Sequence, residues 1–520
     1  MPMKKSLNRR EFLKWIAGGA AVATVPALAS NCGSRAQLVS SGSGGASGVH
    51  MTYFDQFGVD SGLIQRTIAK GLSRGGDFCD VFLQHQINHW VGMEDGEINR
   101  AYTTVDLGAG IRVLKGDSTG FAYCEELTEK SLMAASDTAS VVADSSPMTR
   151  PKSLAAVKVK NYYTIDVPWS DVGVDKKLPI IERTNKQIRD RDQRIVKVTI
   201  YMSDETSHIL VANSQGLLVE DTQPMALLTA SCVAMQNGKV EVGYQSASAR
   251  DTLRFFSEET IDRVAREAAD YTTMLFDAVP PPVGELPIVM SPGTPAILLH
   301  EAIGHGMEAD FNRKGISIYA DRIGKRIAPD DVTIIDDGTN EHMRGSINID
   351  DEGTPGQRTV LVENGILRSY MHDYISSKHY NLDSTGSGRR QSFRFPPVPR
   401  MRNTYMLNRP YNPEEIIASV DKGLYAEMFS NGQVAIGAGD FTFFLKHGRL
   451  IEKGKLTHVV KDANLTGSGP KVLEHVDMVG NDMVLFSGGG NCGKDGQAVP
   501  VGFGMPTVRA GAISIGGRKS

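Results

Sequence analysis

Three consecutive prolines divide this chain. Residues 280–282 follow a stretch, residues 257–276, in which apolar side chains recur at helical spacing behind the N-capping residue Ser257. A proline run lacks backbone donors and cannot continue a helix, so the helix must end before it. We therefore place a domain boundary here, with an N-terminal domain over residues 51–280 and a C-terminal domain over residues 281–520.

The two parts differ in their hydrophobic patterns. The first part is expected to form a helix near residues 63–69 and strands near residues 80–83, 110–114, 196–202, 208–211 and 217–221. The second part is expected to form a hairpin over 359–367 around Asn364-Gly365, a strand pair at 433–436 and 441–445, and a helix opened by Asn412-Pro413. Helices and strands without strict βαβ alternation indicate an α+β fold: a mixed α/β N-terminal domain and a β-rich C-terminal domain.

Composition excludes some classes of protein. The net charge is −4 and the sequence pI about 6.3, which argues against a nucleic-acid partner. The five cysteines are widely spaced without a CxxC pair, so the chain is not a disulfide scaffold.

The N-terminal segment is typical of an export signal. Arg9-Arg10 precedes Phe12-Leu13 and a weakly apolar stretch that is too short to be a good membrane span. We expect a twin-arginine signal over residues 1–30 and a flexible linker over residues 31–50, placing the protein in the periplasm or on the outer side of the cytoplasmic membrane. A lipid anchor on Cys32 is not favoured, because asparagine is unusual just before such a cysteine.

The sequence His300-Glu301-Ala-Ile-Gly-His305 is the candidate metal-binding and catalytic motif. Zinc takes imidazole, thiolate or carboxylate ligands, and a carboxylate beside the first ligand can act as general base. Two histidines five apart do not share a face of a regular α-helix, so we predict a one-residue π-bulge between them, eased by Gly304. Thr294 is expected to cap this helix, with Pro295 as its first residue.

A catalytic zinc needs a third protein ligand. The residues alone leave this position open among several acidic, thiol and imidazole side chains: Cys492, Glu308, His342, His372 and His379.

Five strings of the sequence resemble the TldD/PmbA family, whose older members were called modulators of DNA gyrase. They are HEAIGHGMEADFNRKG (300–315), GTPGQRTVLVENGIL (353–367), STGSGRRQSFRFPPVPRMRNTYM (384–406), NGQVAIGAGDF (431–441) and GGGNCGKDGQAVPVGFGMPTVRAG (488–511). The resemblance extends from about residue 57 to the C-terminus.

The resemblance implies a zinc peptidase. It assigns the metal to His300, His305 and Cys492 and the general base to Glu301, as in the active, TldD-like branch of the family. It implies short or unfolded peptides as substrates, and a dimer formed with a second copy or with a PmbA-like subunit. The export signal is a departure, since well-known members are cytoplasmic.

Three arginines, Arg389, Arg390 and Arg400, are substrate-binding candidates because guanidinium groups bind carboxylate and peptide carbonyls. They lie among aromatic residues and prolines, and the alternatives are a nucleic-acid-binding loop or a purely structural set of arginine pairs. Asp495 follows the Cys492 loop and is either a substrate- or metal-supporting residue or an ordinary turn residue.

We therefore expect a zinc-dependent metallopeptidase with Glu301 as general base. Two alternatives remain: a non-catalytic regulatory or scaffold subunit of a peptidase complex, and a zinc amidase acting on small amides.

Overall fold

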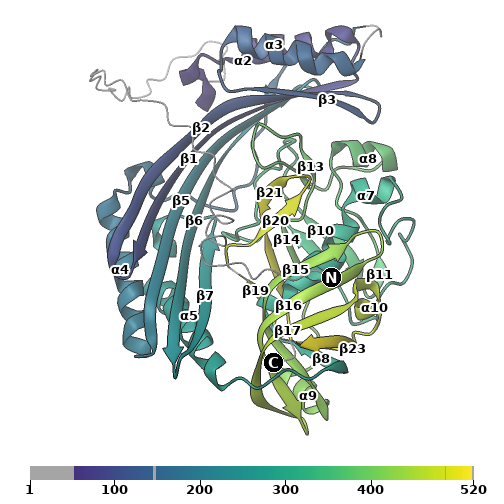
Figure 1. Cartoon of the computed structure of the whole chain (residues 1–520). Coiled ribbons are helices and arrows are strands. Elements are labelled where there is room, and N and C mark those ends of the chain that lie inside the picture. The colour runs from purple at the N-terminus through teal and green to yellow at the C-terminus, as the bar shows by residue number, and fades with distance from the viewer. Residues whose placement is uncertain (1–51, 144–147, 487, 518–520) are drawn as a thin grey trace, which may run out of the picture. The chain divides into compact units, whose positions relative to one another are not determined.

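The computed structural model describes residues 52–143, 148–486 and 488–517 (Figure 1). These described residues form one compact unit. The expected export signal (1–30) and linker (31–50), and with them Cys32, lie outside the described residues. Among the helices of the described residues, none has the length and apolar character required to cross a bilayer.

A seven-stranded sheet of unusually long strands, here called the N-terminal sheet, dominates the first part of the chain. Its order is β3-β2-β1-β5-β6-β4, with β7 also pairing with β6, and every pairing is antiparallel except that of β4. The strands are β1 Phe78–Glu94, β2 Glu97–Lys115, β3 Ser118–Cys124, β4 Ala155–Ala156, β5 Ile195–Asn213, β6 Leu217–Gln236 and β7 Lys239–Ala249.

The two strands expected at 196–202 and 208–211 are wrong as separate elements, because β5 runs unbroken from Ile195 to Asn213. The polar residues 203–207 interrupt the apolar pattern without interrupting the strand. Their backbone stays in register with β1 on one side and β6 on the other. Ser203, Glu205 and Ser207 line a cavity rather than the apolar core, which explains the break in the pattern.

Four helices cover one face of this sheet. They are α2 Ser61–Gly71, α3 Glu129–Ser140, α4 Val174–Arg191 and α5 Glu258–Thr273. Short 3₁₀ turns adjoin them: η1 Tyr53–Phe57, η2 Leu72–Arg74, η3 Val141–Ala143, η4 Trp169–Asp171, η5 Leu253–Phe255 and η6 Met274–Asp277. The pair α2/α3 packs on Val81 of β1 and the pair α4/α5 near Val91 and Met93 of the same strand. Alternate residues of a strand point to opposite faces, so both pairs lie on one face and the other is left to the rest of the chain (Figure 1).

The second part of the chain contains a ring-shaped sheet and a mixed sheet. The ring sheet has the order β17-β16-β15-β8-β23, closed by pairing of β17 with β23, and β18 also pairs with β23. Its strands are β8 Gly284–Met290, β15 Lys422–Ala435, β16 Asp440–Glu452, β17 Lys455–Ser468, β18 Met478–Val479 and β23 Val508–Gly517. The mixed sheet, in order, is β11 Ile366–Leu367, β10 Arg358–Glu363, β9 Ile334–Asp337, β14 Asn403–Met406, β22 Gly502–Met505 and β19 Val484–Phe486.

Two short hairpins and several short helices complete this part. The hairpins are β12 Gly388–Arg389 with β13 Val398–Pro399, and β20 Asn491–Lys494 with β21 Gln497–Pro500. The helices are α6 Ile297–Leu299, α7 Ala309–Arg313, α8 Tyr374–Tyr380, α9 Pro413–Ala418 and α10 Gly469–Glu474. The α+β fold class, with a β-rich second part, is confirmed.

Local signals identified several elements correctly. Ser257 caps α5 by accepting a hydrogen bond from the Thr260 amide. Asn364 and Gly365 adopt φ angles of 47° and 78°, the positive values that a two-residue hairpin turn requires. The expected boundary at 278–282 falls between η6 and β8, and the assignment of two separate domains stays a prediction.

A buried ion-pair network joins the N-terminal sheet to the second part of the chain. Arg112 of β2 is fully buried and donates to Asp80 of β1 and, at 2.7 Å, to Oε1 of Glu352 in a loop of the second part. Buried charges persist only when paired and hydrogen-bonded, so this network fixes the loop against the sheet.

Candidate metal centre

The helix that carries the two histidines changes its winding between them. After β8 the chain turns at Gly293, which has φ 83°, and continues through η7 (Thr294–Ala296), α6, the π-helical turn η8 (His300–Gly304) and η9 (His305–Met307). The amide of His305 donates to the carbonyl of His300, an i to i+5 hydrogen bond. The predicted π-bulge is confirmed, and it places two residues five apart one turn from each other.

The expected capping role of Thr294 is wrong. Thr294 is the first residue of the 3₁₀ turn, Gly293 precedes it as the N-cap, and no side chain caps the turn. The positive φ of Gly293 makes the entry turn that a capping side chain would otherwise stabilise.

Gly304 is needed for close packing as well as for the bulge. A Cβ atom at this position would lie 2.1 Å from Sδ of Met401, which is itself fully buried. The sequence signal for this glycine was therefore correct, but its packing partner was not visible from the sequence.

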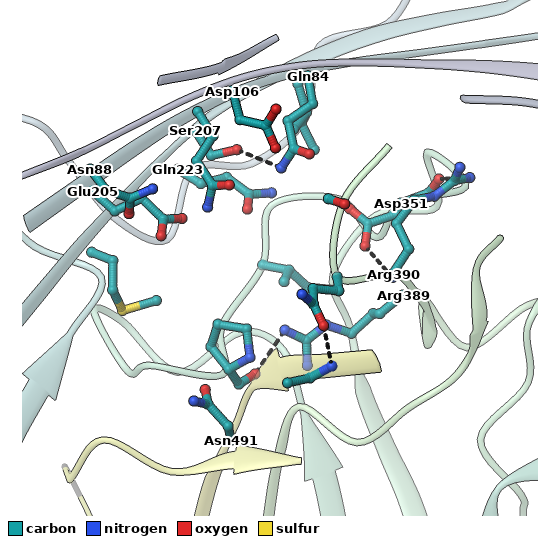
Figure 2. Close-up of a pocket in the computed structure, with 18 of the residues that line it drawn as sticks. Gln84, Asn88, Asp106, Glu205, Ser207, Gln223, Asp351, Arg389, Arg390 and Asn491 are labelled. Carbon is teal, nitrogen blue, oxygen red and sulfur yellow. Dashed lines mark hydrogen bonds between the residues drawn. The ribbon is translucent and has the colours of Figure 1, made fainter. Parts of the chain in front are cut away.

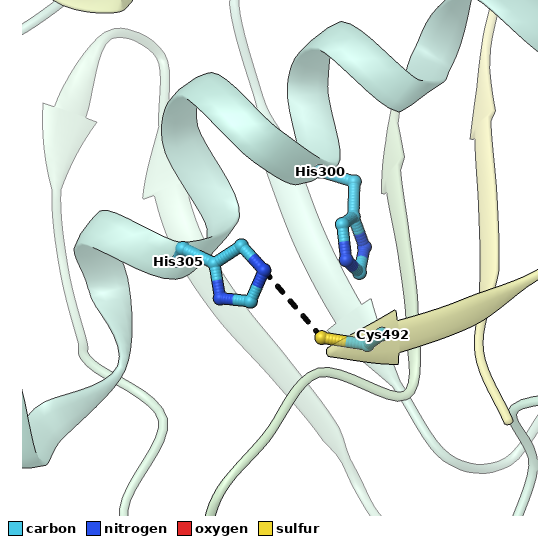
Figure 3. A group of neighbouring side chains, drawn as sticks. All are labelled: His300, His305 and Cys492. Carbon is cyan, nitrogen blue, oxygen red and sulfur yellow. Dashed lines mark hydrogen bonds between the residues drawn. The ribbon is translucent and has the colours of Figure 1, made fainter. Parts of the chain in front are cut away.

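His300, His305 and Cys492 come together from segments almost two hundred residues apart (Figure 3). Their potential ligand atoms all lie within 4.8 Å of one another, and Nε2 of His305 is 3.5 Å from Sγ of Cys492. All three residues are at least 95% buried. Of the five candidates for a third ligand, Cys492 is the one placed in this cluster.

This donor set fits a zinc ion. Ligand atoms of tetrahedral zinc with two nitrogens and one sulfur are about 3.3 to 3.7 Å apart, close to the observed separation of His305 and Cys492. Nδ1 of His300 is buried without a hydrogen-bond partner among the described residues. Three protein ligands would leave a fourth position for water or substrate, as in catalytic zinc sites.

Electrostatics favour the thiolate form of Cys492. Burial alone would raise the pKa of this thiol, but the adjacent His300 and His305 outweigh burial and hold the pKa well below its usual value. Thiolate is the form that binds metal.

Glu301 lies at the edge of the cluster. Its Oε2 is 3.8 Å from Nε2 of His305, and its side chain keeps 23% of its surface exposed, unlike the buried ligands. Glu301 is thus a carboxylate next to the cluster that remains partly open to solvent.

Three charged residues, Glu308, Lys494 and Asp310, form a series of ion pairs on the Nδ1 side of His305. Oε2 of the fully buried Glu308 is 3.0 Å from Nδ1 of His305, and Nζ of Lys494 is 3.2 Å from the same oxygen and 2.7 Å from Oδ1 of Asp310. Burial would raise the pKa of Glu308, but Lys494 and His305 lower it to about 2. Glu308 thus contacts His305 and Lys494 and does not belong to the cluster of His300, His305 and Cys492.

Sequence reasoning missed Lys494. The signal was the two-residue period of a strand, since residues 492 and 494 of β20 share a face and are both buried. Asp495, by contrast, is an exposed residue of the β20–β21 turn with φ 51°, and the structure does not bring it to the cluster.

The three candidate arginines are buried and donate hydrogen bonds to backbone carbonyls. Arg400 donates to the carbonyl of Cys492, and Arg389 donates to the carbonyls of Met401 and Pro500 at 2.6 and 2.8 Å. Arg390 donates to the carbonyl of Asp351 at 3.1 Å. Arg400 lies nearest the cluster, and Arg389 and Arg390 line a cavity described below.

The remaining histidine candidates lie elsewhere. Nδ1 of His342 is 3.0 Å from the carbonyl of Arg250, His379 is exposed on α8, and His372 is buried beside Tyr380. None of the three belongs to the described cluster.

A partly unpaired strand passes the π turn. β15 packs against η7 and η8, and it pairs with β8 only over residues 424–426. Beyond them, one edge of β15 has no partner strand among the described residues, whereas the facing stretch of β16 is paired on both sides.

Comparison with known proteins gives a consistent result. Three domain profiles match in order: PmbA/TldA metallopeptidase domain 1 over residues 79–143, the central domain over 167–276 and the C-terminal domain over 283–517. A metalloprotease TldD homolog of Buchnera aphidicola is 38% identical over 85% of this chain and 93% of its own length. A zinc metalloprotease TldD homolog of Saccharolobus solfataricus is 26% identical over 86% and 99%.

The fold also matches a solved structure. TldE from Thermococcus kodakarensis superimposes with a TM-score of 0.70 at 20% identity, covering 88% of this chain and 100% of that one. At that identity the likeness supports the fold alone.

Proposed function

The chain belongs to the PmbA/TldD family of metallopeptidases, and from this premise we propose that it is a zinc-dependent peptidase that hydrolyses short or unfolded peptides. The observation that supports the proposal most is the convergence of His300, His305 and Cys492 beside a partly exposed Glu301. A relative named as a zinc metalloprotease supports the choice of metal.

His300, His305 and Cys492 would hold the metal. A bound zinc would supply Lewis-acid polarisation of the scissile carbonyl and acidify the attacking water. Glu301 takes the proton of that water and delivers it to the leaving amine, since it is the partly exposed carboxylate at the cluster. Glu308 and Lys494 keep the ring of His305 in one orientation throughout.

We propose that the substrate backbone binds along the unpaired edge of β15. A peptide in extended form can add to an unpaired strand edge through main-chain hydrogen bonds, which are independent of side-chain identity. Such binding suits short or unfolded peptides, because a folded protein does not present its backbone in this form.

We also propose, from the N-terminal sequence, that the protein is exported by the twin-arginine route and acts in the periplasm or on the outer side of the cytoplasmic membrane. We further propose that the protein forms a dimer, either with a second copy or with a PmbA-like subunit.

A cleavage panel tests the activity. The full chain, supplied with zinc, is assayed on unstructured peptides and on simple amides, alongside Glu301→Gln and the exposed control Glu363→Gln. We expect peptide cleavage by wild type and control, and loss of about 10²-fold or more in Glu301→Gln with metal retained. Cleavage of the amides but no peptide would favour the amidase, and equal activity of Glu301→Gln would favour a scaffold subunit.

A further inference from the structure

A cavity of about 610 Å³ lies between the open face of the N-terminal sheet and loops of the second part of the chain (Figure 2). Figure 2 shows Gln84, Asn88 and Glu205 on the sheet side, and Arg389 and Asp351 on the loop side. Its volume falls in the range of pockets that hold small organic ligands.

The cavity is separate from the metal centre. Asn491 lines it, whereas Cys492, the next residue of β20, belongs to the metal cluster. Successive side chains of a strand point to opposite faces, so the β20–β21 hairpin stands between the two sites.

The sheet side of the cavity is a floor of amides and hydroxyls. Gln86 of β1 pairs with Ser207 of β5, which pairs with Gln223 of β6, and in the next row Asn88 pairs with Glu205. The same strands carry apolar residues on their other face, beneath the helices. A polar floor inside a fold is costly unless its groups are hydrogen-bonded, and amides bond equally to donors and acceptors.

Arg250 supplies an unpaired buried cation. It follows β7, lines the cavity and is only 4% exposed. Its Nε has no hydrogen-bond partner among the described residues, and its guanidinium forms no ion pair with any of them. It lies 5.4 Å from the Tyr163 ring and acts on the carboxylates of Glu205, Asp221 and Asp351 only through longer-range attraction. A buried guanidinium without a directly hydrogen-bonded anion is incompletely satisfied, so an anion bound in the cavity would stabilise it.

The other four arginines of the cavity already have partners, and Arg394 forms ion pairs with Asp106 and Glu125. Arg389 and Arg390 hold backbone carbonyls, as described above. Arg344 donates to Ser248 at 2.6 Å, to Asn491 at 2.8 Å and to the carbonyl of Gly490 at 2.9 Å. These hydrogen-bond partners are neutral, so the positive charge of Arg344 adds to that of Arg250 in the cavity.

The charge balance indicates a ligand of low charge. Five arginines and four carboxylates line the cavity, which disfavours a polyanion such as a nucleotide. A single carboxylate attached to amide groups matches both the free guanidinium and the amide floor.

We propose that this cavity is a second binding site, distinct from the metal centre, for the free carboxylate end of a short peptide, with Arg250 as the carboxylate anchor and the Gln86–Ser207–Gln223 row facing the peptide amides. The choice of a peptide among carboxylate ligands rests on the proposed peptidase function, whereas the anion site itself does not.

The test is a binding measurement on the full chain. All proteins carry Glu301→Gln so that no ligand is cleaved, and an N-acetyl dipeptide is compared with its C-terminal amide by titration calorimetry. Trp90 lines the cavity, so its fluorescence gives a local readout of occupancy. We expect the free acid to bind at least about tenfold tighter than the amide, since an Arg–carboxylate pair is a charge-assisted bond.

Substitutions at Arg250 test whether the carboxylate binds in this cavity. Arg250→Gln should remove the preference for the acid, Arg250→Lys should retain part of it, and the exposed Arg322→Gln should behave like the parent. Equal binding of acid and amide by the parent, or an unchanged preference in Arg250→Gln, would overturn the proposal. Should Arg250→Gln not fold, the parent's Trp90 response to acid but not amide decides the matter, and its absence overturns the proposal.

Inorganic phosphate separates the two parts of the inference. If phosphate displaces the acid dipeptide and binds as tightly, the site takes simple anions and the peptide assignment is wrong. This outcome, like a positive one, is independent of catalysis, because a chain that cleaves no peptide at all would still show binding that depends on Arg250.

Discussion

Glu308 holds the ring nitrogen of His305 that faces away from Cys492: its Oε2 lies 3.0 Å from Nδ1, while Nε2 lies 3.5 Å from Sγ of the cysteine. Such a contact fixes the plane of the ring and would leave Nε2 to bind the proposed metal. The orientation of His305 therefore depends on a residue outside the cluster of His300, His305 and Cys492.

Replacing Glu308 with glutamine should weaken zinc binding by about 10- to 100-fold, the range found when such supporting carboxylates are changed. The variant keeps the shape of the side chain and loses the charge that faces His305 and Lys494. Competition with a chelator measures the affinity, with the exposed Glu363→Gln as control. Wild-type affinity in Glu308→Gln would show that the contact is incidental.

The backbone of the π turn packs closely against Gly469, the first residue of α10. A Cβ atom there would lie 2.5 Å from the carbonyl oxygen of Ala302. Gly469→Ala should lower the free energy of unfolding by about 1 to 3 kcal/mol, since overpacking displaces backbone. Gly493→Ala, where nothing lies within 4 Å, should change it by less than about 0.5 kcal/mol. Denaturant titration compares the two, and equal stability would argue against the contact.

Acid should destabilise the protein partly through His208. Burial, helped by the neighbouring His85, lowers the pKa of His208 to about 4, and its ring stacks on Tyr53 at 3.7 Å between centroids. A folded-state pKa below the unfolded value of 6.5 means that this stability is complete above pH 6.5 and is lost as the pH falls toward 4.

His208→Gln should therefore make the fall in melting temperature between pH 6.5 and 4 shallower than in wild type. The side chain of His458 is 64% exposed, and His458→Gln serves as the matched control whose profile should follow wild type. If both variants follow the wild-type profile, His208 is not part of the acid response.

Sequence periodicity predicted local features well where the cause was local. The five-residue spacing of His300 and His305 required a π turn, and the Asn364-Gly365 pair required a tight hairpin. The polar interior of β5 was misread because its side chains face a cavity instead of core or solvent.

Sequence periodicity could not predict contacts between segments that are distant in the sequence. The residues left Cys492 as one of five candidates, and only the family resemblance selected it, since nothing local shows that β20 meets the π turn. The period of β20 could have shown that Lys494 shares a face with Cys492, but its partner Glu308 and the cavity beside Arg250 come from segments distant in the sequence.

The most direct test of the metal centre is X-ray absorption at the zinc edge on the full chain loaded with one equivalent of zinc. The account predicts one sulfur at about 2.3 Å and two imidazole nitrogens at about 2.0 to 2.1 Å, with a further light ligand, and loss of the sulfur shell in Cys492→Ser. Failure to bind zinc, or a bound zinc without sulfur in its first coordination sphere, would contradict the assignment of His300, His305 and Cys492 as its ligands.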